Sequence, residues 1–157
     1  MEKLMTDVVS PTVRSRMMAG IRGKNTRPEM RLRRFLHGKG FRYRLHQGDL
    51  PGSPDLLLPR YRTAIFVHGC FWHRHPGCRL TTTPATNQEF WADKFAANVA
   101  RDHAAVRKLL SDEWNVIIIW ECGLKMPNAE ECLGWLPARI TAGDAGYLEW
   151  PVIAEPL

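Results

Sequence analysis

The sequence contains no hydrophobic run long enough to cross a membrane, since its longest wholly apolar stretch is VIIIW at 116–120. Its first residues lack the charged, apolar and small-residue layout of an export signal. It also contains no internal repeat, low-complexity tract or linker. We therefore expect an intracellular, cytoplasmic protein with no membrane partner, folded as a single domain over residues 1–157.

Acidic residues are too few to balance the basic ones, and the formal net charge is +6, from 22 Lys and Arg against 16 Asp and Glu. The excess is concentrated between Arg14 and Arg44. Such a concentration favours a polyanionic partner, most often nucleic acid, although a solvated basic face has the same composition.

Cysteine is also scarce, with four residues at 70, 78, 122 and 132. Without an export signal, metal ligands or free thiols are favoured over disulfides. A hydrophobic content of 45% and six tryptophans exclude a disordered chain.

Helical and strand patterns alternate along the chain and predict an α/β domain. Residues 26–40 predict a helix capped by a Thr26/Glu29 box, and residues 86–110 predict a longer one opened by a Thr86/Glu89 box. Further expected elements are a short basic helix at 12–25, strands at 41–46, 55–59, 63–69 and 115–121, a loop at 70–86, and a helix at about 128–140. The buried stripe expected on the longer helix is Trp91, Phe95, Val99, Val106 and Leu110.

A metal-ligand spacing occurs within HGCFWHRHPGC, residues 68–78. Cys70, His75 and Cys78 give C-x4-H-x2-C, and zinc sites commonly use three cysteines and one histidine in a tetrahedron. Cys122, just after a predicted strand, is the candidate fourth ligand. The spacing leaves open whether His73 or His75 is the histidine ligand, and a loop with two buried cysteines is the alternative.

Hydrolytic side chains are expected to meet at one sheet edge. Asp55 begins a predicted strand and can hold a divalent cation, while His68 ends the next strand and His73 follows closely. A carboxylate, two histidines and magnesium suffice for phosphodiester hydrolysis. Taken singly, Asp55 also fits a turn, His68 a packed strand end and Glu29 a helix cap.

Five motifs together carry a family resemblance: RSRMMAGIRGKNTRPEMRLRR, DLPGSPD, FVHGCFWHRHPGC, PATNQEFWADKFAANVARD and VIIIWEC. In this order, from about residue 14 to 124, they resemble the very-short-patch repair (Vsr) DNA mismatch endonucleases. The resemblance implies a restriction-endonuclease-like, PD-(D/E)XK-type fold, a central mixed sheet flanked by helices with a structural zinc site. It divides the chain into a basic DNA-contacting segment (1–25), a catalytic core (26–124) and a C-terminal extension (125–157).

The implied activity is a magnesium-dependent nick on the 5′ side of the thymine in T:G mismatches, which arise by deamination of 5-methylcytosine. The implied partners are mismatched double-stranded DNA and, functionally, a cytosine-5 DNA methyltransferase and downstream repair proteins. We expect a monomer, because a two-fold dimer would favour a palindrome.

The resemblance also assigns roles by motif position. Asp55 would bind magnesium together with the backbone carbonyl of Val67, and His73 would be the general base. His68 and Glu29 would hold metal-bound waters or the scissile phosphate. Zinc would be bound by Cys70, His75, Cys78 and Cys122.

For DNA, the resemblance implies an aromatic wedge that enters the base stack beside the mismatch, where a mismatched step is cheaper to open. The wedge residues are Phe71, Trp72 and Trp91, and core packing is the alternative for all three. Further DNA contacts are assigned to Met18, Lys94, Asn98 and Arg101, of which the last three follow the polar side of the long helix.

The sequence departs from the family pattern at two places near the site. Val67 stands where threonine is common, which preserves a backbone ligand but removes a hydroxyl. Ser53 replaces a more usual arginine and so removes one potential phosphate contact. Two other functions remain open: a zinc-stabilised DNA-binding module without catalysis, and a restriction-type nuclease that cuts both strands of paired DNA.

Overall fold

A five-stranded mixed sheet organises the chain in the computed structural model, which describes residues 24–143 and 146–153. The strand order is β1-β2-β3-β4-β5, with antiparallel pairing among the first three and parallel pairing from β3 onward. The strands are β1 (Arg44–Leu45), β2 (Leu56–Leu58), β3 (Thr63–His68), β4 (Asn115–Trp120) and β5 (Tyr147–Trp150). The helices are α2 (Arg27–Gly38), the 3-10 helix η1 (Pro59–Tyr61), α3 (Cys70–His73), α4 (Gln88–Ser111), α5 (Glu121–Leu124), α6 (Ala129–Cys132) and α7 (Leu136–Ala142).

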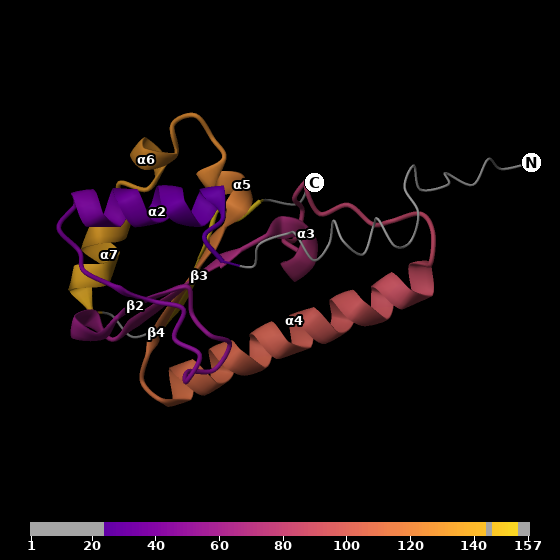
Figure 1. Ribbon diagram of the computed structural model, residues 1–157, viewed down its shortest axis with the longest axis horizontal. Helices are drawn as coiled ribbons and strands as arrows, with labels where there is room; N and C mark the ends of the chain where they lie inside the picture. The colour runs from indigo at the N-terminus through magenta and orange to yellow at the C-terminus, as the bar shows by residue number, and fades with distance from the viewer. Residues whose placement is uncertain (1–23, 144–145, 154–157) are drawn as a thin grey trace, which may run out of the picture.

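Helices cover both faces of the sheet, with α2 and α7 on one side and α4 across the other (Figure 1). Alternate strand residues point to opposite faces, so Ile117 packs with Leu32 and Leu36 of α2, whereas Ile118 packs with Leu109 of α4. Each such side chain contributes about 1.5–3 kcal/mol when fully buried. The 24-residue α4 connects β3 to its parallel neighbour β4, since parallel strands need a long crossover.

The structure confirms the helix predicted at 26–40 and the strands predicted at 55–59, 63–69 and 115–121, to within a few residues at their ends. The strand predicted at 41–46 is reduced to two residues, Arg44–Leu45, and it ends where the chain turns at His46, whose φ is 48°.

The prediction that a Thr86/Glu89 box caps the long helix is wrong. That helix begins at Gln88, and its N-cap, Asn87, has a φ of 53° and no side-chain capping bond. The predicted stripe is also only partly correct, because Phe95 is buried and the other four residues are half-buried.

Two further predictions need correction. The single helix predicted at 128–140 is two helices, α6 and α7, separated around Gly134. The loop predicted at 70–86 begins with the one-turn helix α3, and β5 was not expected from the sequence. The short basic helix predicted at 12–25 lies almost entirely outside the described residues. No helix within residues 24–143 and 146–153 combines the length and apolar character needed to cross a membrane.

Candidate active site and metal centre

Asp55 lies where two strand ends meet. It immediately precedes β2, and because β2 runs antiparallel to β3, with Leu56 opposite Ile65, the start of β2 is beside the end of β3. The Asp55 Oδ2 accepts a hydrogen bond from the Val67 backbone N–H at 2.7 Å. This bond holds the carboxylate beside the C-terminal end of β3, next to the Val67 peptide.

A second carboxylate, that of Glu29 in α2, reaches the same end of β3. Thr26 caps the helix, since its Oγ1 accepts from the Glu29 N–H at 3.3 Å, while the Glu29 carboxylate accepts from the Asn25 N–H at 3.3 Å. Glu29 as a whole is nonetheless 1% exposed, and one of its carboxylate oxygens lies within 4.8 Å of ligand atoms of Asp55 and His46. Glu29 therefore belongs to the helix cap and also to a group that could hold a metal ion.

The surroundings of Asp55 favour its protonated form when no cation is present. The pKa of Asp55 is raised to about 7, chiefly by burial and also by the adjacent Glu29 carboxylate, while the Val67 N–H and His73 act in the opposite direction. Two carboxylates pressed together in a partly dry site relieve this penalty by binding a cation.

Arg33 and His46 complete this group, and sequence reasoning did not identify either. The Arg33 guanidinium forms a buried ion pair with Glu29, one helical turn away, and lies 2.9 Å from His46 Nε2. The four-residue spacing of Glu29 and Arg33 is a helical ion-pair signal that could have indicated the first of these contacts.

His68 and His73 lie at the end of β3 and in α3, with their rings stacked at 3.8 Å. The Nδ1 of His73 is 2.6 Å from Oδ2 of Asp102, a residue of α4 that the sequence analysis missed. A carboxylate on Nδ1 fixes the ring and leaves Nε2 as the nitrogen that can accept a proton.

His68 stays uncharged at neutral pH. Burial and, to a smaller extent, proximity to His73 lower the pKa of His68 to about 3, against an opposing effect of Asp102. A neutral imidazole stacked on His73 adds no charge that would compete for the Asp102 carboxylate.

Cys70, His75, Cys78 and Cys122 form a second cluster, whose ligand atoms all lie within 4.8 Å of one another. The Nδ1 of His75 faces Cys122 Sγ at 3.4 Å, and its Nε2 lies 2.8 Å from the Pro151 carbonyl oxygen. Since a carbonyl can only accept, Nε2 carries the hydrogen and Nδ1 presents its lone pair to the sulfurs. His73, in contrast, is held by Asp102.

The donors of this cluster fit zinc. Three sulfurs and one imidazole nitrogen match the usual tetrahedral set, and the Pro151 carbonyl orients the histidine as outer partners of metal ligands do. Burial raises the pKa of the Cys70 and Cys122 thiols, and the crowding of the sulfurs adds to this rise. Such thiols deprotonate when a metal binds.

An aromatic cluster joins α3 to α4. The Phe71 ring lies 4.9 Å from Trp72, 6.0 Å from Trp91 and 5.2 Å from Phe95. Phe95 is buried, whereas the other three are half-buried, so the residues predicted to form a wedge pack on one another and keep exposed surface. The neighbouring Phe90 is 59% exposed and was not predicted as part of the cluster.

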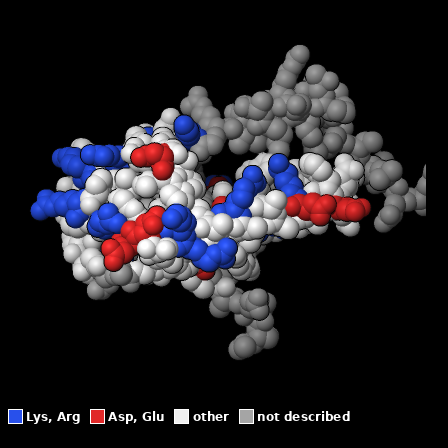
Figure 2. Space-filling model, turned by 90° about the horizontal axis from the view of Figure 1, so that it is seen from below, with Lys and Arg blue, Asp and Glu red and all other residues white. Residues whose placement is uncertain are grey.

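The predicted DNA contacts on α4 differ in their surroundings. Lys94 is exposed. Asn98 donates to the Trp72 carbonyl at 3.2 Å and accepts from Arg101, so both residues help to position the aromatic cluster. Figure 2 shows basic side chains spread over the face that carries α4, with acidic side chains interspersed among them and a further acidic group at one end. Met18 lies outside the described residues.

A mixed α/β sheet with a carboxylate pair and a histidine–aspartate pair beside the same strand end has an arrangement that metal-dependent hydrolases use. Residues 6–79 match the family described as DNA mismatch endonuclease Vsr. The chain is 45% identical over 136 residues to the type II nicking enzyme V.XorIIP of Xanthomonas oryzae, covering 87% of this chain and 95% of that relative. It is 43% identical over 121 residues to the DNA mismatch endonuclease Vsr of Escherichia coli, covering 77% of each. A third relative, the type II nicking enzyme V.NmeAIP of Neisseria meningitidis, is 40% identical over 121 residues, covering 77% of this chain and 86% of that relative.

The chain belongs to the Vsr family of DNA mismatch endonucleases. This confirms the resemblance drawn from the five motifs, and it favours a DNA endonuclease over a DNA-binding module without catalysis.

Proposed function

We propose that this protein nicks double-stranded DNA on the 5′ side of the thymine in a T:G mismatch, by magnesium-dependent hydrolysis. One observation carries the proposal: the Asp55 carboxylate, held by the Val67 N–H at 2.7 Å, shares its end of β3 with the His73–Asp102 pair. Candidate cation ligands and a candidate general base therefore lie together at the C-terminal end of β3.

The proton transfer follows from the orientation of His73. Asp102 holds Nδ1, so Nε2 takes the proton as water attacks the phosphorus, and the bond to the leaving oxygen breaks. A cavity of about 320 Å³ opens at this pair, lined also by Tyr147 and Glu149 of β5, and offers room for that water. Asp55 and the Val67 carbonyl would hold a magnesium ion, with Glu29 holding its bound waters, and the ion would supply positive charge to balance the negative charge that develops on the phosphate.

The fold and the second cluster have supporting roles in the proposal. The sheet, with three antiparallel strands and a helical crossover to a parallel fourth, supports a restriction-endonuclease-like, PD-(D/E)XK-type architecture. Zinc on Cys70, His75, Cys78 and Cys122 would stiffen the loop that carries Phe71 and Trp72. These aromatics, with Trp91, would replace the stacking lost beside the mismatch.

The biological setting belongs to the same proposal. The enzyme would act as a cytoplasmic monomer on the products of 5-methylcytosine deamination, alongside a cytosine-5 DNA methyltransferase and downstream repair proteins. Residues 1–25, including Met18, would contact DNA through their positive charge.

The test is a cleavage assay with both strands labelled, on matched duplexes with T:G, T:A or C:G at one position. Each duplex is incubated with and without magnesium, in several flanking contexts. The proposal predicts a magnesium-dependent break in the T strand of the T:G duplex alone. Cleavage of both strands of paired DNA would assign the protein to the restriction-type nucleases, and tight binding without a break in any context would favour a non-catalytic module.

A further inference from the structure

Arg33 brings a permanent positive charge into the carboxylate group described above. Arg33 as a whole is 8% exposed, and its guanidinium donates to Asn25 Oδ1 at 2.7 Å as well as to the Glu29 carboxylate. Arginine does not deprotonate in proteins, so this charge is present at every working pH.

His46 is prevented from binding a metal by the same guanidinium. Arg33 can only donate, so His46 Nε2, 2.9 Å away, must accept, and the single lone pair of the neutral ring is used. The hydrogen is then on Nδ1, which faces Asp55 Oδ1 at 3.9 Å. The ligands that remain at this end of the site are two carboxylates, and one of them is already ion-paired.

The charges in the group indicate how many cations it can accept. With both carboxylates ionised, as a bound cation favours, Glu29 and Asp55 carry two negative charges and Arg33 one positive charge, which leaves one net negative charge. One divalent cation turns this into a single positive charge, which a phosphodiester balances. A second ion, about 3.5–4 Å from the first as in two-metal nucleases, would leave a large uncompensated charge in a partly buried site.

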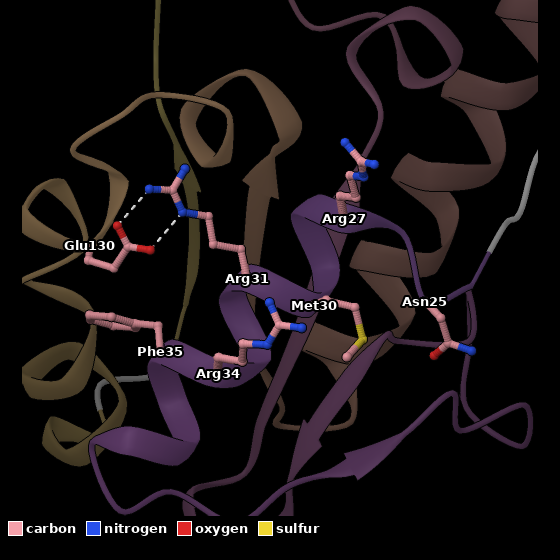
Figure 3. Close-up of a pocket in the computed structure, with 7 residues that line it drawn as sticks. All are labelled: Asn25, Arg27, Met30, Arg31, Arg34, Phe35 and Glu130. Atoms are coloured by element: carbon pink, nitrogen blue, oxygen red, sulfur yellow. Dashed lines mark hydrogen bonds and ion pairs between the residues drawn. The ribbon is translucent and has the colours of Figure 1, made fainter.

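The neighbouring arginines of α2 are used differently. Arg31 forms a two-bond ion pair with Glu130, each contact at 2.7 Å, and so ties α2 to the C-terminal segment (Figure 3). Arg34 is exposed and lines a cavity of about 670 Å³ on that side of the helix. Of these three arginines, Arg33 is the one that pairs with Glu29.

Stability alone does not explain a buried pair of this kind. Replacing a buried ion pair by apolar residues of similar size often leaves stability unchanged or increases it. The Nε of Arg33 is also buried without a hydrogen-bond partner among the described residues. The Arg33–Glu29 ion pair is therefore better explained by a function in the carboxylate group than by a contribution to the stability of the fold.

We propose that Arg33 takes the place of a second divalent cation: it stays paired with Glu29, so that the centre holds one metal ion, bound chiefly by Asp55. Arg33 is then a positioning and charge-balancing residue. This inference rests on the proposed function for the reaction at this site, and it adds the number of ions that the reaction uses.

The direct test counts Mn²⁺ by electron paramagnetic resonance in zinc-loaded protein bound to the nicked T:G duplex, which cannot be cut again at that position. Ions bound by the duplex alone are subtracted. We expect one Mn²⁺ per chain and a magnesium dependence of nicking with a Hill coefficient of about 1.

Variants of Arg33 supply the matched comparison. Arg33→Met removes the charge at similar length, and we expect a second Mn²⁺ and a Hill coefficient that rises toward about 2. Arg33→Lys keeps the charge and should bind one ion. Arg34→Met removes a charge one residue away on the exposed side and should leave both readouts unchanged. If Arg33→Met does not fold, Glu29→Gln with Arg33→Met removes both charges and should bind one ion.

The outcomes separate this inference from the proposed function. A parent protein that nicks T:G but binds two Mn²⁺ overturns the inference and leaves the function intact. The inference is also overturned if the Arg33→Met variant folds, binds one Mn²⁺ and keeps the magnesium dependence of the parent. A parent that binds one ion and leaves T:G uncut supports the inference and overturns the function, and a parent that binds none overturns both.

Discussion

The Nδ1 of His73 lies 2.6 Å from Oδ2 of Asp102, which joins a one-turn helix at the end of β3 to the middle of the long helix α4. The contact spans 29 residues of sequence, and it orients the imidazole whose Nε2 is the proposed proton acceptor. Because Asp102 is on α4 and outside the cysteine–histidine cluster, the pair can be altered at this residue without changing a zinc ligand.

Replacing the carboxylate of Asp102 should slow the chemical step. Asp102→Asn can hold the wrong tautomer of His73, and general-base catalysis contributes about 100- to 10,000-fold. We expect single-turnover nicking of T:G DNA to fall by about 100-fold or more, with DNA affinity within about threefold of the parent. Equal losses of rate and affinity would indicate that Asp102 serves to hold the fold.

The pH dependence of stability should report Asp55 when no divalent cation is added. Since the folded-state pKa of Asp55 is raised to about 7, its contribution to stability is greatest below its ordinary pKa near 4 and is lost as the pH rises toward 7. The lowered pKa of His68, about 3, acts in the opposite direction between about 3 and 6.5. The parent must therefore be compared with Asp55→Asn.

We expect the difference in unfolding free energy, parent minus Asp55→Asn, to decrease steadily from pH 4 to pH 7, measured by denaturant titration of zinc-loaded protein. Added magnesium should flatten this trend, because the cation favours the charged carboxylate. A difference that stays constant with pH would contradict the account of the Asp55 environment.

The sequence predicts the parts of this site that lie in local patterns. Cys70, His75 and Cys78 fall within nine residues, and Asp55 and His68 flank strands whose apolar composition is plain. For the cysteines, Asp55 and His68, spacing and strand polarity predict which side chains meet, whereas the choice of His75 over His73 as a ligand came from the family resemblance. The Thr26 cap is predictable for the same reason.

Residues brought in by tertiary packing were not predictable in this way. Asp102 is one of several polar residues on α4, and only the path of that helix across the sheet places it against His73. His46 enters the site because the chain turns at a positive φ. The strand β5 is short and half-exposed, so its pattern is weak, although the Pro151 carbonyl just after it orients His75.

Loss of one cysteine ligand should remove the structural metal. Cys122→Ser should release zinc, measured as metal per chain by mass spectrometry, and lower the free energy of unfolding, because zinc binding is coupled to folding. Cys132→Ser is the matched control, because Cys132 lies outside the cluster. Retention of one zinc per chain by Cys122→Ser would contradict the ligand set.

The aromatic cluster should matter more for mismatched than for paired DNA. Trp72→Ala removes a ring predicted to stack on bases, and such stacking contributes about 1–3 kcal/mol. We expect affinity for the T:G duplex to fall by about 10- to 100-fold while affinity for the T:A duplex changes little, measured by fluorescence anisotropy. A uniform loss on both duplexes would instead indicate that Trp72 only packs between α3 and α4.

The central claim is most directly tested by the ratio of single-turnover nicking rates in the T strand for T:G and T:A duplexes of one sequence, with magnesium, mapped to the nucleotide. We predict a break at the 5′ side of the mismatched thymine, faster on T:G than on T:A by about 10- to 100-fold or more, and absent in Asp55→Asn. A ratio near one, or an Asp55→Asn variant that nicks at the parental rate, would contradict the proposed function.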